Sequence, residues 1–260
     1  MILSKRTLQV LKNFADTNPN ILIKKNTKEI LTINHMRSVF SSALIDEKFE
    51  NNILLYDLHE FLKLYKSLSN PDIVKVDNDF IHIKSDDFFV KYRQSLAESL
   101  ITPSKYPVMP TKDCSASFRL TKDNNSKILK ITSTCCLPDV LFNADGKTLK
   151  CILLDKKNDL TSKFTFEIGK TKDTFSMFLK VENMNLLSTD YDVVLAGGNI
   201  GRFLSTEIPF KTYVATEKDS IWNDNWKSDQ SKKSDVYIKL KKLENAYNAK
   251  VSKLLSLRKH

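Results

Sequence analysis

Two pairs of aspartates come closer to a catalytic pattern than any other residues of this chain. Asp77 and Asp79 form one acidic pair and Asp86 and Asp87 form another, an arrangement that would suit a two-metal nuclease. Both pairs fall in expected turns, where aspartate is favoured because it bonds to the nearby backbone, and no third carboxylate or histidine converges on them in sequence. The pattern therefore indicates turns in preference to metal-dependent catalysis.

Cysteines and histidines have neither the spacing of a zinc site nor that of a disulfide framework. No Cys-x-x-Cys pair occurs, and the histidines are scattered. We therefore predict buried, reduced thiols and no bound metal. The residues concerned are Cys114, Cys135, Cys136 and Cys151, with His35, His59, His82 and His260.

The glycines of LAGGNIG, Gly197, Gly198 and Gly201, are the only glycine-rich stretch of the chain. A phosphate-binding loop would need a following Lys-Ser or Lys-Thr and a strand-to-helix context, and both are missing, so a hairpin turn is the preferred interpretation. Serine, cysteine and histidine form no recognisable nucleophile motif either. The sequence predicts no catalytic residue and no cofactor.

Length and composition fit two ordinary globular cores. The chain has 260 residues, of which 41% are apolar. No run approaches the roughly 18 apolar residues that span a bilayer, and the first residues lack the apolar segment of a signal peptide. We therefore expect an intracellular protein.

Positive charge is concentrated toward the C-terminus. The net charge is +10, of which residues 1–218 contribute +5 (31 Lys and Arg against 26 Asp and Glu) and residues 219–260 contribute +5 (10 against 5). Such a balance favours a polyanionic partner, either nucleic acid or, less readily, an anionic membrane.

Three expected helices, over 4–18, 57–68 and about 123–136, each place apolar residues on one side and basic residues on the other. Ser4 and Asp57 are the expected N-caps of the first two, and Asn13 shares the basic side of the first. Any one of these basic sides can be an ordinary solvated face. Three of them at equivalent points of a repeated unit would form one positive surface suited to phosphates. No aromatic residues lie among the lysines, so duplex is favoured over single-stranded DNA. The basic residues are Lys5, Arg6, Lys12, Lys63, Lys66, Lys127 and Lys130.

A short motif recurs along the chain and suggests an internal repeat. Each copy follows a helix-like segment, and separations of 119 and 120 relate the first two copies to the last two. We predict two α+β domains of about 110 residues, each a doubled unit of strand, helix and several strands. The four copies are NPNILI (18–23), NPDIVK (70–75), LPDVLF (137–142) and DYDVVL (190–195), the last preceded by a weak helix signal over 182–190.

The chain divides by composition into five parts. Three prolines and no helical period mark 100–114 as a connector between domains. The end of the chain carries an apolar stripe on a basic helix, which would pack, pair with another helix, bind a partner or contact DNA. The expected parts are domain 1 (1–99), the connector (100–114), domain 2 (115–218), a linker (219–235) and a basic amphipathic helix (236–258).

Several stretches, in order and spacing from residue 1 to about 218, resemble the sliding clamps of T-even-type bacteriophages, relatives of the eukaryotic clamp. The chain extends past the usual end of that family by residues 219–260, and it is basic even without them. The stretches are LSKRTLQVLKNFADTN with ILIKKN, YDLHEFL, TFSMFLKVENMN, YDVVL and YVATE.

The resemblance implies the DNA-clamp fold and a function without chemistry. It implies a homotrimeric ring with antiparallel sheets outside and helices lining a hole, and the seven basic residues named above would face duplex DNA. A clamp loader would close the ring on DNA, and the ring would tether the DNA polymerase in the cytoplasm of an infected host cell. Subunits of the family join edge strand to edge strand, for which FFVKYRQ (88–94) and KFTFEIG (163–169) are candidates.

Other interpretations of the same features stay open. One is a duplex-DNA-binding replication accessory protein with this fold but no closed ring. Another is a virion or scaffold protein that assembles through its C-terminal helix, and a nuclease comes last.

Overall fold

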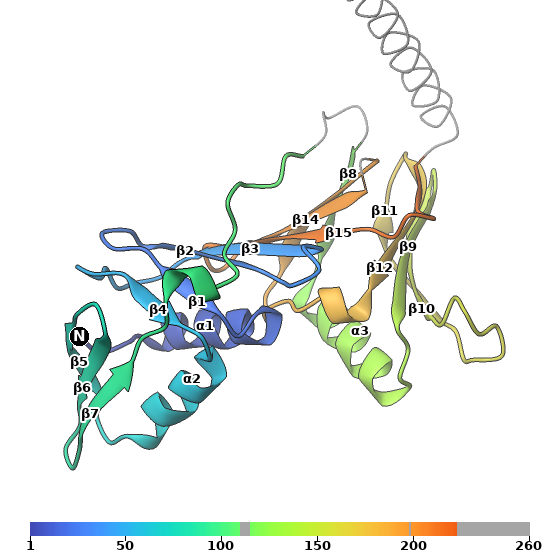
Figure 1. Ribbon diagram of the computed structural model, residues 1–260. Helices are drawn as coiled ribbons and strands as arrows, with labels where there is room; N and C mark the ends of the chain where they lie inside the picture. The colour runs from blue at the N-terminus through green and yellow to red at the C-terminus, as the bar shows by residue number, and fades with distance from the viewer. Residues whose placement is uncertain (110–114, 198, 223–260) are drawn as a thin grey trace, which may run out of the picture.

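The computed structural model describes residues 1–109, 115–197 and 199–222, shown in colour in Figure 1. The helix expected over 236–258 lies outside these residues, and so do residues 223–235 of the expected linker. The described helices are α1 (Lys5–Thr17), α2 (Leu58–Ser67) and α3 (Lys122–Thr134), with short 3-10 helices η1 (Ala97–Ser99) and η3 (Val181–Asn183).

The strands divide between two halves of the chain. The first half holds β1 (Ile21–Ile23), β2 (Glu29–Ile33), β3 (Val39–Leu44), β4 (Ile53–Leu55), β5 (Asp72–Val76), β6 (Phe80–Lys84) and β7 (Phe89–Arg93). The second half holds β8 (Ser115–Leu120), β9 (Asp139–Asp145), β10 (Thr148–Leu154), β11 (Phe164–Lys170), β12 (Thr174–Lys180), β13 (Tyr191–Ala196), β14 (Ile200–Ser205), β15 (Phe210–Ala215) and β16 (Ile221–Trp222).

Each copy of the repeated motif leads from a helix into a strand, as the sequence predicts. The four copies open β1, β5, β9 and β13, which follow α1, α2, α3 and η3. Proline near the start of three copies ends the helical run because it lacks a backbone N–H donor. The strand that follows then begins at equivalent points of each unit.

Side-chain caps start all three α-helices. Ser4, Asp57 and Thr121 have extended backbone, and each accepts a hydrogen bond from the backbone N–H three residues on. The caps expected at Ser4 and Asp57 are confirmed. Helix α3 starts one residue earlier than expected because Thr121 caps it.

Helix α3 ends at Thr134, before Cys135 and Cys136, whose thiols we expected to be buried. Cys135 is the C-cap, and Cys136 adopts a left-handed backbone with a φ of 51°. Both side chains are exposed, whereas Cys151 on β10 is buried. The prediction of buried thiols is therefore wrong for Cys135 and Cys136, because the helical period does not extend to them.

A 3-10 turn, η3, stands where a weak fourth helix was expected. The residues after it bury Met184, Leu186 and Leu187, and this spacing does not give a one-sided helical face. Asn185 instead bonds to α1 with both its backbone and its side chain. The fourth unit is thus joined to the first through an irregular segment.

The sheets are antiparallel, and one of them crosses the boundary between the halves. The strand orders are β1-β4, β5-β6-β7, β11-β10-β9-β12-β16 and β2-β3-β15-β14-β13-β8. In the last of these, β3 pairs with β15, so that Ser41 faces Thr212 and their hydroxyls lie 2.7 Å apart. The two halves are therefore held as one continuous sheet.

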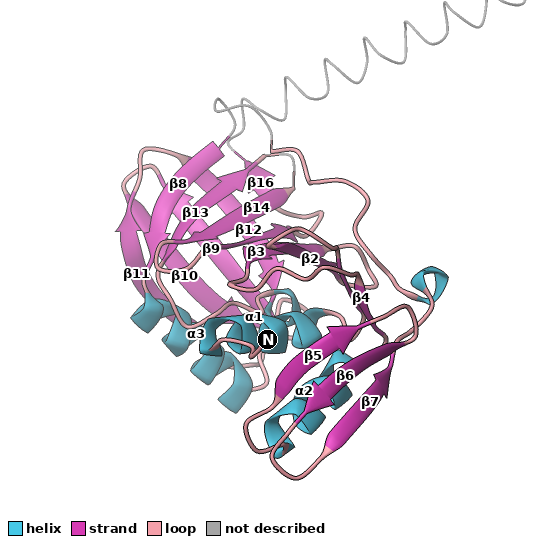
Figure 2. Ribbon diagram, turned by 90° about the vertical axis from the view of Figure 1, so that its left-hand side faces the viewer, coloured by secondary structure: helices cyan, strands magenta, loops and turns pink. Residues whose placement is uncertain are grey.

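The helices lie together on one side of these sheets. Figure 1 shows α1, α2 and α3 along the lower side, with the central sheet above them and the β5–β7 and β9–β12 sheets at the flanks. In Figure 2 the β5–β7 sheet faces the viewer and α2 lies behind it. The core fills the space between, for example where Phe14 of α1 meets Phe210 of β15 at a centroid distance of 6.3 Å.

The connector residues up to 109 form neither helix nor strand after η1, and they run over the outer face of the central sheet. Tyr106 packs on Phe40 of β3 with a centroid distance of 5.1 Å, and the Lys211 ammonium lies 4.7 Å from the Tyr106 ring centroid. Burial and a hydrogen bond to Glu29 raise the pKa of Tyr106 to about 12. These contacts anchor the connector on the side of the sheet opposite the helices.

Candidate nucleic-acid interface

Six of the seven basic residues expected to face DNA are exposed on the polar sides of the helices. Within the described residues none of the six ammonium groups takes part in an ion pair, so each is available to a phosphate. They are Lys5 and Lys12 on α1, Lys63 and Lys66 on α2, and Lys127 and Lys130 on α3.

Arg6 differs from the other six. Its guanidinium forms an ion pair with Asp46, and its Nε is buried without a partner. A charge that is already paired binds a phosphate less strongly, because the existing carboxylate competes. We therefore assign Arg6 mainly to holding the start of α1.

Acidic side chains reduce the positive charge of the helix side but are too few to neutralise it. Asp16 on α1 lies 3.9 Å from the His59 ring of α2, which links the polar sides of the two helices. Glu60 and Asp123 are also exposed on α2 and α3. Against three carboxylates stand six lysines, so the helix side keeps a net positive charge.

The start of α1 is held by carboxylates from the segment after β3. Glu47, only 8% exposed, accepts hydrogen bonds from the Ser4 backbone N–H at 2.5 Å and from the Thr7 hydroxyl. The Ser4 hydroxyl donates to Asp46 at 2.6 Å. Negative groups are favoured at a helix N-terminus, so this pair fixes the direction in which α1 presents Lys5 and Lys12.

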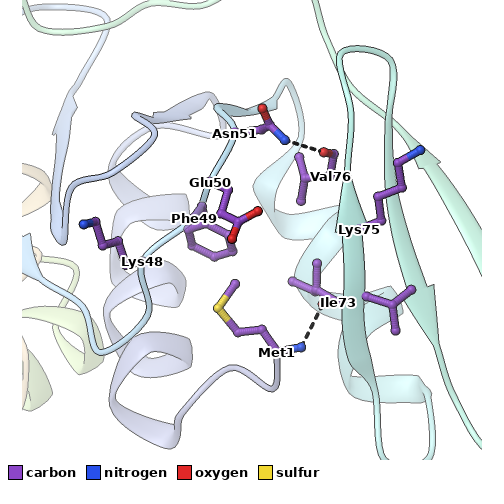
Figure 3. A pocket seen from close by; sticks show the side chains of 9 residues that line it. Met1, Lys48, Phe49, Glu50, Asn51, Ile73, Lys75 and Val76 are labelled. Atoms are coloured by element: carbon purple, nitrogen blue, oxygen red, sulfur yellow. Dashed lines mark hydrogen bonds between the residues drawn. The ribbon is translucent and has the colours of Figure 1, made fainter.

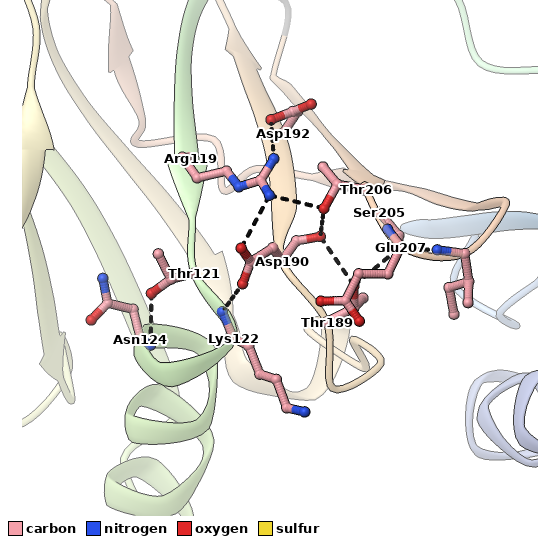
Figure 4. A network of polar contacts seen from close by, with 11 residues as sticks. Arg119, Thr121, Lys122, Asn124, Thr189, Asp190, Asp192, Ser205, Thr206 and Glu207 are labelled. Carbon is pink, nitrogen blue, oxygen red and sulfur yellow. Dashed lines mark hydrogen bonds and ion pairs between the residues drawn. The ribbon is translucent and has the colours of Figure 1, made fainter.

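The start of α3 is held in the same way by Asp190, as Figure 4 shows. One carboxylate oxygen accepts from the Lys122 backbone N–H at 2.7 Å, and the other accepts from Arg119 at 3.0 Å. Arg119 also bonds to Asp192 at 2.9 Å and to the Thr206 hydroxyl. The Lys122 hydrogen bond, and then Arg119, lower the pKa of Asp190.

A groove of about 490 Å³ lies between residues 48–51 and β5, shown in Figure 3. At one end the Met1 backbone exchanges hydrogen bonds with Ile73, and at the other the Asn51 side chain donates to the Val76 carbonyl. Phe49 lines the groove and is buried. The Met1 contact places the residues that lead into α1, so this part of the molecule supports the helix side.

The acidic pairs considered for metal binding lie far from one another. Asp77 and Asp79 are in the β5–β6 turn, while Asp86 and Asp87 are in the β6–β7 turn, at the other end of β6. No group of three potential metal ligands occurs in the described part of the chain. Asp77 accepts from the His82 ring at 2.7 Å, and this bond lowers the pKa of the carboxyl.

The glycine-rich stretch forms a turn between β13 and β14. Asn199 occupies the left-handed region there with a φ of 60°, and Gly201 lies on β14 with its backbone against Leu195. No helix follows, so the stretch lacks the strand-to-helix geometry of a phosphate loop. Nor does any helix in the described ranges have the length and apolar character needed to cross a membrane.

Asp46, Glu47 and Asp190 are functional supports that the sequence reasoning did not find. Each contacts a helix start from a distant part of the chain, with separations of 40, 43 and 68 residues for the bonds of Arg6, Ser4 and Lys122. The local sequence around each helix contains only its own cap. A remote partner of this kind leaves no spacing signal.

Comparison with known proteins gives relatives that match most of the chain. No family model matches. The chain is 28% identical over 223 residues to the sliding clamp of Vibrio phage KVP40, covering 84% of this chain and 99% of that protein. It is 23% identical over 233 residues to the sliding clamp of Escherichia phage RB69, covering 85% and 98%.

This chain resembles the phage sliding clamps. The resemblance stated from the sequence is thus confirmed, and the curated relatives include the sliding clamp of phage T4, 25% identical over 228 residues.

Solved structures confirm the DNA-clamp fold for this clamp-like chain. The proliferating cellular nuclear antigen of Entamoeba histolytica aligns with a TM-score of 0.56 at 16% identity, covering 81% of this chain and 94% of that one. The DNA polymerase sliding clamp of Pseudomonas aeruginosa aligns with a TM-score of 0.60 at 15% identity, covering 87% and 66%.

Proposed function

We propose that this chain is a DNA polymerase sliding clamp, a ring that encircles duplex DNA and tethers the replicative polymerase for processive synthesis. One observation carries the proposal: α1, α2 and α3 lie on the same side of the sheets and expose lysines there, in a chain that resembles phage sliding clamps. The helix side is then the wall of the hole.

Lysines on this wall would contact phosphates and not bases. Contacts of this kind bind any sequence and allow the protein to slide, because no base identity is read. Lys5, Lys12, Lys63, Lys66, Lys127 and Lys130 are the residues we assign to this role, with Arg6 as a support of α1.

Free strand edges support closure into a ring. β7 is the last strand of its sheet and β11 is the last of another, and these are the segments named from the sequence as candidates for subunit contacts. Unpaired edges invite pairing with another chain. We infer that β7 of one copy pairs with β11 of the next.

The pairing inside the chain provides the geometry for the pairing between chains. β3 occupies in the first half the place that β11 occupies in the second, and β7 corresponds to β15. Since β3 and β15 pair antiparallel, a β11–β7 contact would repeat the same junction. Three copies, each with residues 1–99 and 115–218 as its two domains, would close the ring as a homotrimer with pseudo-sixfold symmetry.

The proposed function requires partners but no reaction at this chain. A clamp loader would open and close the ring at a primed site, and the DNA polymerase would bind its surface, in the cytoplasm of an infected host cell. We assign no catalytic residue. The clamp acts by remaining linked to the DNA.

Mass in solution is the first test. The proposal predicts a particle of three times 29.9 kDa, with a central hole in two-dimensional particle images. A monomer that persists at micromolar concentration in the presence of a loader and primed DNA would contradict the ring. That result would favour the alternative of a duplex-binding accessory protein with this fold. Large assemblies that disappear when residues 236–258 are removed would instead favour a scaffold protein.

A further inference from the structure

The outer face of the β5–β6–β7 sheet carries a set of side chains that the ring does not use. The inner face of this sheet packs on α2: Ile81 and Ile83 are fully buried, and Tyr92 meets Phe61 at a centroid distance of 5.3 Å. Successive residues of a strand point to opposite faces, so the residues between them point outward. Figure 2 shows this face toward the viewer.

Aromatic rings on this outer face each lie opposite a basic side chain of the neighbouring strand. The register pairs Phe80 with Arg93, His82 with Lys91, and Lys84 with Phe89. Each pair therefore places one ring beside one positive charge, and the ring and the charge change strands at the last pair. On this face β6 carries Phe80, His82 and Lys84, and β7 carries Arg93, Lys91 and Phe89, so rings and cations lie side by side.

The rings are in contact with each other, and Phe89 is the most accessible of them, while the His82 side chain is only 12% exposed. His82 lies 6.3 Å from Phe80 and 5.9 Å from Phe89 between centroids, so the three rings form a row. Phe89 is 60% exposed, and Phe80 is half-buried without belonging to the core. An exposed phenylalanine beside a second ring is an unusual use of surface unless something covers it.

The cations of this face are free to bind an anion. Lys84, Lys91 and Arg93 are exposed and take part in no ion pair among the described residues. Lys75 of β5 faces His82 from the other side and lies 3.5 Å from Asp77.

Two carboxylates on this face are engaged. Asp77 accepts from His82 at 2.7 Å, and Asp72, opposite Lys84, pairs with the Met1 ammonium. The exposed Asp79, Asp86 and Asp87 lie in the turns at the two ends of β6, so the charges left on the strand face itself are those of the three cations.

The geometry points to a binding surface for single-stranded DNA on the outer face of β5–β6–β7, with Phe80 and Phe89 stacking on bases and Lys84, Lys91 and Arg93 contacting phosphates. A positive surface with interleaved rings suits an unpaired strand, whose bases have free π-faces, whereas duplex bases are already stacked. An acidic peptide would satisfy the cations but would leave the row of rings without a matching partner. This site lies behind α2, on the opposite side of the sheet from the helix lysines, and it does not depend on ring formation.

Binding of the full chain to two labelled DNAs tests this site. Fluorescence anisotropy would compare an oligothymidylate of about 16 nucleotides with a duplex hairpin at about 100 mM salt. F80A/F89A removes the rings and keeps the charge, and K84Q/K91Q/R93Q removes the charge and keeps the rings. K63Q/K66Q is the matched control, because it removes lysines from α2 on the other side of the same sheet.

We expect F80A/F89A to weaken oligothymidylate binding by about tenfold or more and to leave duplex binding unchanged. K84Q/K91Q/R93Q should also weaken it and reduce the salt slope by about 2. K63Q/K66Q should weaken duplex binding only. Unchanged oligothymidylate affinity in both outer-face variants would overturn the site.

A second measurement guards against a variant that is merely unfolded. Phe89→Trp keeps a ring at an exposed position, and its fluorescence should be quenched by oligothymidylate if bases stack there. No quenching would overturn the stacking contact. Two other outcomes would assign the face to a protein partner and overturn the proposal. One is tighter binding of an oligoglutamate peptide than of oligothymidylate. The other is a change of oligomer mass in F80A/F89A with no change in DNA affinity.

Discussion

Asn13 on α1 and Asn185 after η3 hydrogen-bond to each other in both directions across 172 residues of sequence. The Asn13 amide donates to the Asn185 carbonyl at 3.0 Å and to its side-chain oxygen at 3.1 Å, and the Asn185 amide donates to the Asn13 carbonyl at 2.8 Å. Asn13 is 5% exposed. The pair holds the first helix of one half against the irregular segment of the other, beneath the shared β3–β15 junction.

Asn185→Ala should lower the free energy of unfolding by about 1–3 kcal/mol, because it removes the side-chain donor to the Asn13 carbonyl and one of the two acceptors of the buried Asn13 amide. Chemical denaturation of the single and double variants measures this. The double variant Asn13→Ala/Asn185→Ala should cost clearly less than the sum of the two singles, since both singles remove the same hydrogen bond between the two side chains. Simple additivity would show that the two side chains act independently.

Reversal of Lys5, Lys12, Lys63 and Lys127 to Glu should weaken duplex binding and polymerase stimulation while leaving assembly intact. Loss of up to four phosphate contacts would reduce the salt slope by about 3 to 4. The control reverses Lys24, Lys147, Lys157 and Lys172, which are exposed away from the helices and give the same net charge. Equal loss in both variants, or unchanged polymerase stimulation in the first, would defeat the assignment of the helix side.

Val90→Cys with Phe166→Cys should join neighbouring chains by disulfides into a closed covalent trimer. By the internal repeat, Val90 corresponds to Thr212 and Phe166 to Ser41, which face each other in the β3–β15 pairing. Directly opposed antiparallel residues lie about 4.5–5.5 Å apart between Cα atoms, within reach of a disulfide.

Denaturing electrophoresis under oxidising conditions detects the cross-linked species. Cys135 and Cys136 are exposed and should first be changed to Ser. Each new cysteine alone is the control and should give no ladder. Absence of any cross-link in a chain that is trimeric by mass would place the subunit contact on other strands.

Asp190→Asn should lower the melting temperature at neutral pH, because it removes the charge that accepts from the start of α3 and from Arg119. The pKa of Asp190 is lowered in the folded protein, so its contribution is present at neutral pH and is lost as the pH falls below about 4. Thermal melts from pH 7 to pH 3 should therefore show the difference from the unmodified protein shrinking with acid. Asp87→Asn, in an exposed turn, is the control, and a difference that stays constant with pH would exclude this ionic role.

Gly201→Ala should destabilise the protein by about 1–3 kcal/mol, whereas Gly169→Ala should change stability by less than about 0.5 kcal/mol. A Cβ at position 201 would lie 2.9 Å from the buried Leu195 side chain and 3.4 Å from Phe203, while a Cβ at 169 meets nothing within 4 Å. Urea denaturation of the two variants gives the comparison. Equal stability of both would show that β14 shifts to admit the methyl group.

Local sequence patterns are sufficient to predict most helices and strand starts of the fold. The caps at Ser4 and Asp57, the apolar side of α1 and the four turn-to-strand motifs each depend on neighbours in sequence, and the structure has them where they were expected. The six exposed lysines follow from the same helical period. These features depend on short-range physics that a single sequence contains.

Features made by distant residues could not be read in this way. The helical period predicts that Asn13 is on the exposed polar side of α1, yet Asn185 covers it. The same period predicts that Cys135 is on the inner side of α3, but the helix ends before it. The sequence also does not predict the mixed row of rings and cations on β6 and β7, because it does not give the register that brings Phe80 beside Arg93.

Trp222 stacks on Phe175 with a centroid distance of 5.3 Å and an interplanar angle of 6°, and β16 adds to the edge of β12. Residues 221 and 222 fall within the stretch assigned to a linker, but Trp222 is 5% exposed and belongs to the sheet. A shortened chain that stops at residue 218 would lose the stacking contact of Trp222 with Phe175 and leave this edge of β12 unpaired. One that stops at residue 222 would keep the stack and remove six of the ten excess positive charges (10 Lys and Arg against 4 Asp and Glu in residues 223–260), so it is the proper starting point for separating the body of the protein from its basic extension.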